Sequence, residues 1–405
     1  MCGKRLTAKF FNARQFDAIA ERNCMKQNVK IVIAPDSFKG SISAHHAAAA
    51  IEIGILEGLP NGITAETVKC PIADGGEGTL DALVNEHDRI TLMVTGTNGA
   101  PVTASYGILG TTAVIEMASA AGLTLVEESC RNAASSTTFG VGELIHDALD
   151  RGFRHILLTV GGSGTNDGGC GMLCALGATF LQKDGTAFIP TGGTLSQIDI
   201  IDLSALDSRL TDTRFTVATD VKNPLCGDTG ATRVYARQKG ADDATLDQME
   251  LGMCHYAQVL QNVCGKDIAN MQGCGAGGGL AAPLLAFCNA SIESGIHAVL
   301  KANHFADRIK NADLIITGEG KIDRQSLFGK AISGVAEAAK MQKIPVVCLV
   351  GCIGDDINVL KGMGITDILA ISDLAPDTEY SIRHADILLS QLAKQYIQEW
   401  IPSSK

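Results

Sequence analysis

Apolar and polar positions first form a regular pattern near residue 28, where short apolar runs begin to alternate with segments of helical spacing. Ile31–Ala34 predicts a buried strand, and Ser43 is a suitable N-cap for an alanine-rich helix over residues 44–58. Thr64–Lys69 alternates like a second strand, and a second helix is expected from about Leu80. This order of strand, loop and helix predicts a parallel sheet with right-handed crossovers.

The pattern changes between about Arg89 and Ala290. Two alternating segments, Arg89–Thr95 and Val102–Leu109, flank the turn pair Asn98-Gly99 and predict an antiparallel hairpin. Further strands are expected at 113–117, 156–160 and 215–219, and helices at 135–150, 171–177 and 246–263. We therefore expect a second domain with a mixed α/β fold.

The simple alternation returns from about Ser294. Strands are expected at 313–317, 345–350 and 367–372, and helices at 330–342 and 381–400. Because these units resemble the first ones, we predict a discontinuous parallel-sheet domain from residues 25–88 and 291–405, with a mixed α/β domain of residues 89–290 inserted into it. A length of 405 residues exceeds one ordinary core, which also favours two domains.

The first 24 residues fit neither pattern and lack the apolar core of a signal peptide. Met25 comes directly before the first strand. We therefore predict that Met25 is the native start and that residues 1–24 are an upstream or non-native extension. The alternative is a short amphipathic helix that packs on the surface.

Composition narrows the class of protein. Apolar residues make up 46% of the chain and charged residues 19%, as in a globular protein. The net charge of −11 argues against a nucleic-acid or anionic-membrane partner, and no apolar run approaches the roughly 18 residues of a membrane span. The 13 scattered cysteines favour reduced thiols. We expect a cytoplasmic monomer or homodimer that acts on a small molecule.

A glycine-rich stretch at the centre of the chain is the strongest candidate for chemistry. The apolar run 156–160 leads into residues 161–169, and a small-residue helix pattern follows. A strand, a glycine-rich turn and a helix together offer backbone N–H groups to an anion. The plainer alternative is a tight turn capped by Asn166 and Asp167.

Similar polar loops recur at the ends of predicted strands, each with an acidic residue beside Gly, Ser, Asn or Lys. They cover residues 36–40, 74–78, 161–167, 220–223 and 318–323. Phosphoryl transfer needs this mixture, because N–H groups and a lysine hold phosphate oxygens while carboxylates hold Mg²⁺ or orient a hydroxyl. Ligands of parallel sheets bind outside the carboxyl ends of the strands. We therefore expect these loops to form one site.

Other catalytic motifs are weak or absent from the sequence. There is no Walker A loop, no histidine pair at metal-ligand spacing, and no GxSxG elbow around Ser163. Residues 273–278 match GxGxxG but lack a clear preceding strand, so a nicotinamide-dependent oxidoreductase is a weak alternative. A non-catalytic sensor of sugar acids or nucleotides is the other alternative.

Four segments together resemble the glycerate kinase family of bacterial galactarate, glucarate and glyoxylate catabolism, of the type I, glycerate 2-kinase kind. They are residues 33–41, 71–79, 161–169 and 317–323. The resemblance implies ATP- and Mg²⁺-dependent phosphorylation of D-glycerate, at O2 to give 2-phosphoglycerate, with 3-phosphoglycerate formation as the alternative. It also implies a flavodoxin-like domain and an inserted, restriction-enzyme-like domain.

Roles for single residues are hypotheses from chemistry. Lys39 binds phosphate or the glycerate carboxylate, and Asp36 or Asp167 is the general base. The candidates for substrate or phosphate binding are Ser37, Gly75, Gly76, Gly162, Ser163, Gly164, Thr165, Asn166, Lys222, Asn223 and Gly318. The candidates for metal binding are Asp74, Glu77, Asp220, Glu319 and Asp323.

Overall fold

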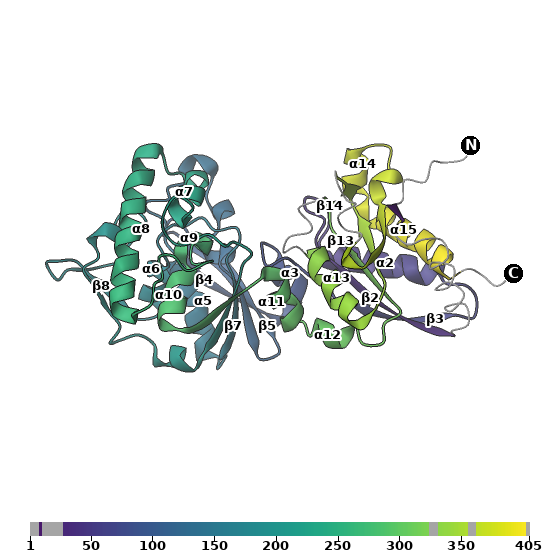
Figure 1. The fold of residues 1–405 in the computed structure, drawn as a ribbon, viewed down its shortest axis with the longest axis horizontal. Helices are drawn as coiled ribbons and strands as arrows, with labels where there is room; N and C mark the ends of the chain where they lie inside the picture. Colours follow the sequence, from purple (N-terminus) through teal and green to yellow (C-terminus); the bar gives the residue numbers. More distant parts are fainter. Residues whose placement is uncertain (1–7, 10–26, 324–330, 355–361, 402–405) are drawn as a thin grey trace. The chain divides into compact units, whose positions relative to one another are not determined.

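The computed structural model describes residues 8–9, 27–323, 331–354 and 362–401, which form two compact units (Figure 1). Unit 1 contains Met1–Asp74, Asp81–Leu83 and Val299–Lys405, and unit 2 contains Gly75–Leu80 and Val84–Ala298. The predicted native start at Met25 and the predicted helix start at Lys330 lie outside the described residues. The predicted domain boundaries at 88/89 and 290/291 stay a prediction.

Unit 1 is built on a six-stranded sheet in the order β1-β17-β15-β13-β2-β3. Its strands are β1 (Ala8–Lys9), β2 (Asn28–Pro35), β3 (Thr64–Lys69), β13 (Leu314–Gly318), β15 (Val346–Val350) and β17 (Ile365–Ala370). All are parallel except β1, which pairs antiparallel with β17. Without β1, this is the doubly wound order of flavodoxin-like folds, so the predicted fold class is confirmed.

Helices cover both faces of this sheet. On one face, α2 (Ala44–Gly58) and α15 (Ala385–Trp400) pack with the side chains of Ile31 and Ile33, and buried Trp400 belongs to the same core (Figure 1). On the other face, α13 (Ala331–Gln342) packs against alternate residues of β15.

The starts of α2 and α15 show how well the sequence pattern predicts the ends of helices. The helix α2 begins where predicted, because the Ser43 side chain accepts a hydrogen bond from the His46 N–H at 3.3 Å. The single helix predicted over 381–400 is instead α14 (Thr378–Arg383) and α15, separated at His384. The side chain of Asp377 caps α14 by accepting a hydrogen bond from the Tyr380 N–H.

The strand order of unit 1 has a topological switch point between β2 and β13. From β2 the chain first continues to β3 on one side and later to β13 on the other side. The Asp36 N–H donates a 2.8 Å hydrogen bond to the Gly318 carbonyl, which ties together the loops that leave these two strands. In doubly wound folds, ligands bind at this point.

Unit 2 is built on a mixed sheet in the order β12-β11-β7-β6-β5-β4. Its strands are β4 (Arg89–Thr95), β5 (Pro101–Leu109), β6 (Thr112–Glu116), β7 (His155–Thr159), β11 (Arg214–Ala218) and β12 (Asn289–Glu293). The last four are parallel, and β4 and β5 form the predicted hairpin. Gly99 has a φ of +82°, which explains the glycine in its turn.

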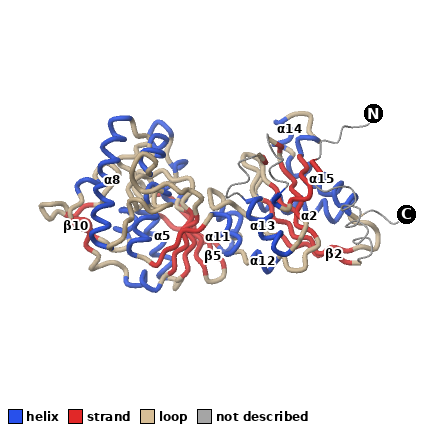
Figure 2. Tube along the Cα trace, in the orientation of Figure 1, coloured by secondary structure: helices blue, strands red, loops and turns tan. Residues whose placement is uncertain are grey.

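Helices of unit 2 pack around this sheet, as the red strands and blue helices of Figure 2 show. They include α5 (Phe139–Asp150), α6 (Cys170–Ala175), α8 (Asp243–Cys264) and α10 (Ala281–Phe287). The expected helix over 135–150 begins four residues late, because the N–H groups of Ser135 and Ser136 both donate to the carbonyl of Asn132 in a turn. Within the described part of the chain, none of the helices is both long and apolar enough to span a membrane.

Candidate functional site

Three carboxylates lie at the carboxyl edge of the unit 1 sheet. Asp36 follows β2, Asp74 belongs to the loop after β3, and Glu319 follows β13 directly. Glu319 is 9% exposed, and both it and Asp74 are close enough to Asp36 to act on its ionisation. Three acidic groups from three segments thus meet at the switch point of the sheet.

Burial raises the pKa of Asp36 to about 7, and the nearby charge of Asp74 raises it in the same direction. Glu319 adds a smaller effect, while hydrogen bonding from Ser37 opposes the shift. Like charges held together in this way disfavour full ionisation unless a cation joins them. Carboxylate oxygens are also the ligands that Mg²⁺ prefers, so the donor set fits a divalent cation.

Glycines keep the loops of this edge close together. A Cβ on Gly318 would lie 1.9 Å from the carbonyl oxygen of Leu349, and one on Gly320 would lie 3.4 Å from the backbone nitrogen of Lys39. The side chain of Lys39 is exposed. Asp323 is placed differently from the three carboxylates, because its side chain pairs with the Lys321 ammonium at 3.3 Å.

In unit 2, the predicted central loop follows β7 and passes beside the loop of residues 75–80. A Cβ on Gly161 would lie 2.9 Å from the Cα of Gly76, and a Cβ on Gly75 would lie 2.5 Å from the Cα of Gly295. The Leu80 N–H donates to the Glu116 carboxylate at 2.8 Å. The structure therefore gathers residues 75–80, the central loop and the exits of β6 and β12.

Asp167 is wholly buried beneath the central loop. Its carboxylate accepts hydrogen bonds from the N–H and hydroxyl of Thr138, at 2.7 and 2.8 Å, and from the N–H groups of Gly169 and Gly171, at 3.1 and 3.2 Å. The first N–H groups of α6 are thus already used, so the anion site expected at this helix N-terminus is taken by the protein's own carboxylate. This enclosure favours a structural role for Asp167 over the role of general base.

Lys239 is a residue of this site that the sequence did not indicate. It is 1% exposed, and its ammonium donates to the Ser163 hydroxyl at 2.9 Å and to the Thr165 carbonyl at 2.7 Å. Burial lowers the pKa of Lys239 to about 7, against the opposing effect of Asp167. A lysine followed by glycine is typical of an exposed helix end, so no sequence signal marked it.

The remaining candidates lie in the central loop and in the segment that follows β11, and they differ in the hydrogen bonds that they make. Among the described residues, Thr165 Oγ1 and Asn166 Oδ1 are buried without a hydrogen-bond partner, although Asn166 Nδ2 donates to the Thr232 hydroxyl. Asp220 accepts from the Gly295 N–H at 3.2 Å. The Asn223 side chain is held between the Thr229 carbonyl and the Tyr235 hydroxyl.

The other predicted residues of unit 2 are open to solvent to different degrees. Glu77, Gly162 and Lys222 are exposed, Ser163 is half-buried and Gly164 is buried. Exposed groups at the carboxyl edge of a parallel sheet are accessible to a ligand, and we retain them as candidates.

The GxGxxG match at residues 273–278 supports the central loop and does not start a dinucleotide-binding unit. It follows a loop, and Gly277 and Gly278 have positive φ values of 63° and 68°. A Cβ on Gly278 would lie 2.0 Å from the Thr165 carbonyl oxygen, and its own carbonyl accepts from the Gly168 N–H at 3.1 Å. These glycines allow two backbones to touch.

A separate group of possible metal ligands lies near the start of α7 (Ala231–Tyr235) and on α8. One ligand atom each of Cys226, Glu250 and Cys254 lies within 4.8 Å of the others. Two thiols and one carboxylate suit Zn²⁺ better than Mg²⁺. This group therefore does not compete with the carboxylates of unit 1 as the magnesium site.

Comparison with known proteins agrees with the resemblance found in the sequence. Residues 31–401 match the model of the glycerate kinase family. The chain is 44% identical to glycerate kinase of Bacillus subtilis over 90% of this chain and 96% of the relative, and 44% identical to glycerate 2-kinase of Escherichia coli over 85% and 90%. A crystal structure of a protein from Salmonella typhimurium LT2 assigned as glycerate kinase 2 is similar with a TM-score of 0.82 and 38% identity, covering 91% of this chain and 97% of that one.

The contact between Gly278 and the central loop predicts a large effect of one methyl group. Gly278→Ala should lower the free energy of unfolding by about 3 kcal/mol or more, because the Cβ meets the Thr165 carbonyl and the backbone is left-handed. Gly265→Ala is the matched control: its φ is +70° but a Cβ there meets nothing within 4 Å, so it should cost only about 1 kcal/mol. Urea denaturation followed by circular dichroism measures both, and equal losses would contradict the contact.

The raised pKa of Asp36 predicts how stability depends on pH. The native state retains a proton on this carboxyl up to about pH 7, whereas the unfolded chain loses it near 3.8. Metal-free protein should therefore lose stability as the pH rises from 4 to 7. Asp36→Asn removes this term, so at pH 7.5 the variant should exceed the wild type by roughly 4 kcal/mol in unfolding free energy.

Urea denaturation in the presence of a chelator, at pH 5.0 and pH 7.5, measures this difference. Lys239 also titrates near pH 7, but it is present in both proteins and cancels in the comparison. A difference between wild type and variant that does not change with pH would contradict the placement of the three carboxylates.

Proposed function

Because the chain belongs to the glycerate kinase family, we propose that it transfers the γ-phosphoryl group of ATP to O2 of D-glycerate, giving ADP and 2-phosphoglycerate. The observation that carries the proposal is the meeting of Asp36, Asp74 and Glu319 at the switch point of a doubly wound sheet. The choice of O2 is supported by the name of the Escherichia coli relative, glycerate 2-kinase.

The acidic edge of unit 1 fits the metal that kinases use. We assign Asp74 and Glu319 as the side chains that would hold Mg²⁺, because they come from adjacent loops and share their surroundings with a third carboxyl. When bound there, Mg²⁺ would neutralise charge on the phosphates of ATP. Asp323 is a weaker candidate, since Lys321 already pairs with it.

Asp36 is the proposed general base. In the transfer, O2 of glycerate forms a bond to the γ-phosphorus, the bond between that phosphorus and the β–γ bridging oxygen breaks, and the hydroxyl proton passes to the Asp36 carboxylate. Burial is the largest cause of the raised pKa of Asp36 and acts with or without a bound metal, so this carboxyl holds a proton more readily than an exposed aspartate does. The transition state is loose, so positioning matters more than the strength of the base.

Phosphate oxygens need hydrogen-bond donors, and each unit, considered by itself, has candidates. We propose that Lys39 and the nearby N–H groups of unit 1 bind phosphate of ATP. In unit 2 the glycines of the central loop leave Gly162 exposed, with the half-buried Ser163 beside it, and Lys239 fixes the loop from behind. Lys239 is therefore a positioning residue for this loop.

We also propose a cytoplasmic location. ATP is the phosphoryl donor, and every cysteine among the described residues is free, with Cys70, Cys170 and Cys348 buried. Unpaired thiols are typical of a reducing compartment.

A coupled assay tests the function and the position of the new phosphate together. The protein is supplied with ATP and D-glycerate in the presence of enolase, pyruvate kinase and lactate dehydrogenase, and phosphoglycerate mutase is left out. Oxidation of NADH is expected, because enolase accepts 2-phosphoglycerate directly. A signal that appears only after the mutase is added would assign transfer to O3, and ADP formation that does not require glycerate would contradict the proposal.

Loss of the Lys39 side chain should affect catalysis far more than folding. Lys39→Ala removes an exposed ammonium that we place on phosphate, so kcat/KM should fall roughly 100-fold or more while the unfolding free energy changes by less than about 0.5 kcal/mol. Lys310→Ala, which removes an exposed lysine before the opposite end of β13, is the matched control. Near-wild-type turnover in folded Lys39→Ala would remove this residue from the site.

A further inference from the structure

The cluster of Cys226, Glu250 and Cys254 in unit 2 is not used by the function proposed above. One ligand atom of each residue lies within 4.8 Å of the others. Glu250 and Cys254 are four residues apart on α8, so their side chains lie on the same side of the helix, one turn from each other. Cys226 belongs to the segment between β11 and α7. Two separate segments thus bring two thiols and a carboxylate together.

Glu250 places a charged group on the buried face of α8. It is 6% exposed, and Leu246, Met249 and Met253 are buried on the same helix. Glu250 Oε1 accepts a hydrogen bond from the Gly227 N–H at 2.7 Å, whereas Oε2 is buried without a hydrogen-bond partner among the described residues. Buried charges in proteins are paired or bind a metal, so Oε2 requires a ligand that the described part of the chain does not provide.

The charges around Glu250 favour a cation. Arg233 is close enough to Glu250 to interact with it electrostatically, but its guanidinium forms an ion pair with the Asp247 carboxylate. Asp228 adds another negative charge in the same surroundings. Three carboxylates and one guanidinium leave this neighbourhood negative, which attracts a metal ion and repels an anion.

The separation of the ligand atoms suits a small tetrahedral metal ion. Cys254 Sγ lies 3.4 Å from Glu250 Oε1. Two ligands of a tetrahedral Zn²⁺, a sulfur at about 2.3 Å and an oxygen at about 2.0 Å, lie roughly 3.5 Å apart. Thiolates favour Zn²⁺, whereas Mg²⁺ and Ca²⁺ prefer oxygen ligands. The pair on α8 therefore needs little movement to bind this ion.

Backbone contacts hold Cys226 in its place beside α8. The N–H groups of Leu225 and Cys226 donate to the Ala269 carbonyl at 3.1 and 3.4 Å, and the Gly230 N–H donates to the Gly227 carbonyl at 2.8 Å. A Cβ on Gly230 would lie 2.5 Å from the Cys226 carbonyl carbon, so this turn is closely packed. Because the segment is already ordered, binding of a metal costs little conformational entropy.

We propose that Cys226, Glu250 and Cys254 bind one Zn²⁺ ion, with water as the fourth ligand. Both thiols bind as thiolates and release their protons to water. Cys226 is half-buried and Cys254 is exposed, so the ion can enter from solvent. Bound Zn²⁺ links the segment after β11 to α8 and stabilises unit 2. It takes no part in phosphoryl transfer, so the proposal does not depend on the proposed function.

Titration with Co²⁺, a spectroscopic probe for zinc sites, tests the ligand set. Reduced, metal-free protein should take up one Co²⁺ with thiolate-to-cobalt charge-transfer absorption, and Zn²⁺ should displace it. Cys226→Ala and Cys254→Ala should each weaken binding roughly 100-fold or more and reduce this absorption. Glu250→Gln should weaken binding but keep the absorption at saturation, because both thiolates remain. Carboxylates alone give no such band, so Co²⁺ on the acidic residues of unit 1 does not interfere.

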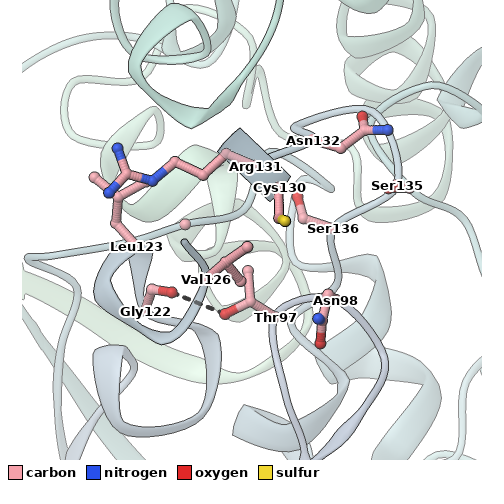
Figure 3. Close-up of a pocket in the computed structure, with 11 residues that line it drawn as sticks. Thr97, Asn98, Gly122, Leu123, Val126, Cys130, Arg131, Asn132, Ser135 and Ser136 are labelled. Carbon is pink, nitrogen blue, oxygen red and sulfur yellow. Dashed lines mark hydrogen bonds between the residues drawn. The ribbon is translucent and has the colours of Figure 1, made fainter. Parts of the chain in front are cut away.

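Cys130→Ala is the matched control, because Cys130 is also an exposed cysteine of unit 2. Cys130 lines a pocket with Arg131 and Ser136, and the lining of that pocket contains no Asp, Glu, His or second Cys (Figure 3). This variant should bind Co²⁺ as the wild type does. A charge-transfer band that survives unchanged in Cys226→Ala and Cys254→Ala, or no uptake of Co²⁺ by the reduced wild type, would overturn the proposal.

Urea denaturation with and without Zn²⁺, followed by circular dichroism, shows whether the folded protein holds the ion. The wild-type midpoint should rise with Zn²⁺ concentration, and the midpoint of Cys254→Ala should not. A fall in the wild-type midpoint would mean that Zn²⁺ binds unfolded thiols instead, and would overturn the proposal.

Glu250→Gln tests the buried carboxylate separately from the thiols. The amide oxygen retains the acceptor for the Gly227 N–H and the variant removes an unpaired buried charge, so metal-free Glu250→Gln should be at least as stable as the wild type. In Zn²⁺ it should lose most of the shift in midpoint. Full stabilisation of this variant by Zn²⁺ would contradict the role of Glu250 as a ligand.

Discussion

The rest of unit 1 depends on one constraint, which is that three neighbouring carboxylates repel one another when all of them are ionised. Parallel strands β2, β3 and β13 end at one edge, and the loops that leave them carry Asp36, Asp74 and Glu319 to it. The interior of the sheet holds these loops in place, so the repulsion cannot be relieved by moving apart. Apolar packing of Ile31, Ile33 and their neighbours thus stabilises an acidic cluster that is unfavourable by itself.

In unit 2, the feature that needs support is the polar, glycine-rich central loop, which is held in one conformation. Two buried charged groups hold this loop. The Asp167 carboxylate accepts hydrogen bonds from four donors, which belong to Thr138 and to the start of α6. The Lys239 ammonium donates to two acceptors of the loop. Gly278 supports the loop from another side by backbone contact. A loop fixed in this way loses little conformational entropy when a ligand binds, which favours affinity.

Most of the fold followed from local signals in the sequence. Ser43, the alternation of Thr64–Lys69 and the pair Asn98-Gly99 each determine a structure within a few residues, so the helix α2, the strand β3 and the hairpin turn lie where expected. The break at His384 was missed, because nothing in the periodicity of residues 381–400 anticipates the Asp377 cap of a separate α14.

The candidate site was harder to predict, because its members are defined by contacts between distant segments. The loops themselves were found, since Gly, Asp and Lys cluster in them. Lys239 was not, because it lies in a sequence typical of a surface and only tertiary packing buries its ammonium. For Asp167 the residue was found, but its enclosure depends on Thr138, 29 residues away.

Trp400 ends α15 and lies in the core of unit 1, and the chain has no second tryptophan. Intrinsic indole fluorescence is therefore a reporter of unit 1 only. An unfolding transition confined to unit 2 would pass unnoticed in tryptophan emission while far-ultraviolet ellipticity records it. Following both optical signals in parallel would show whether the two units unfold together or separately, without a fluorescent label.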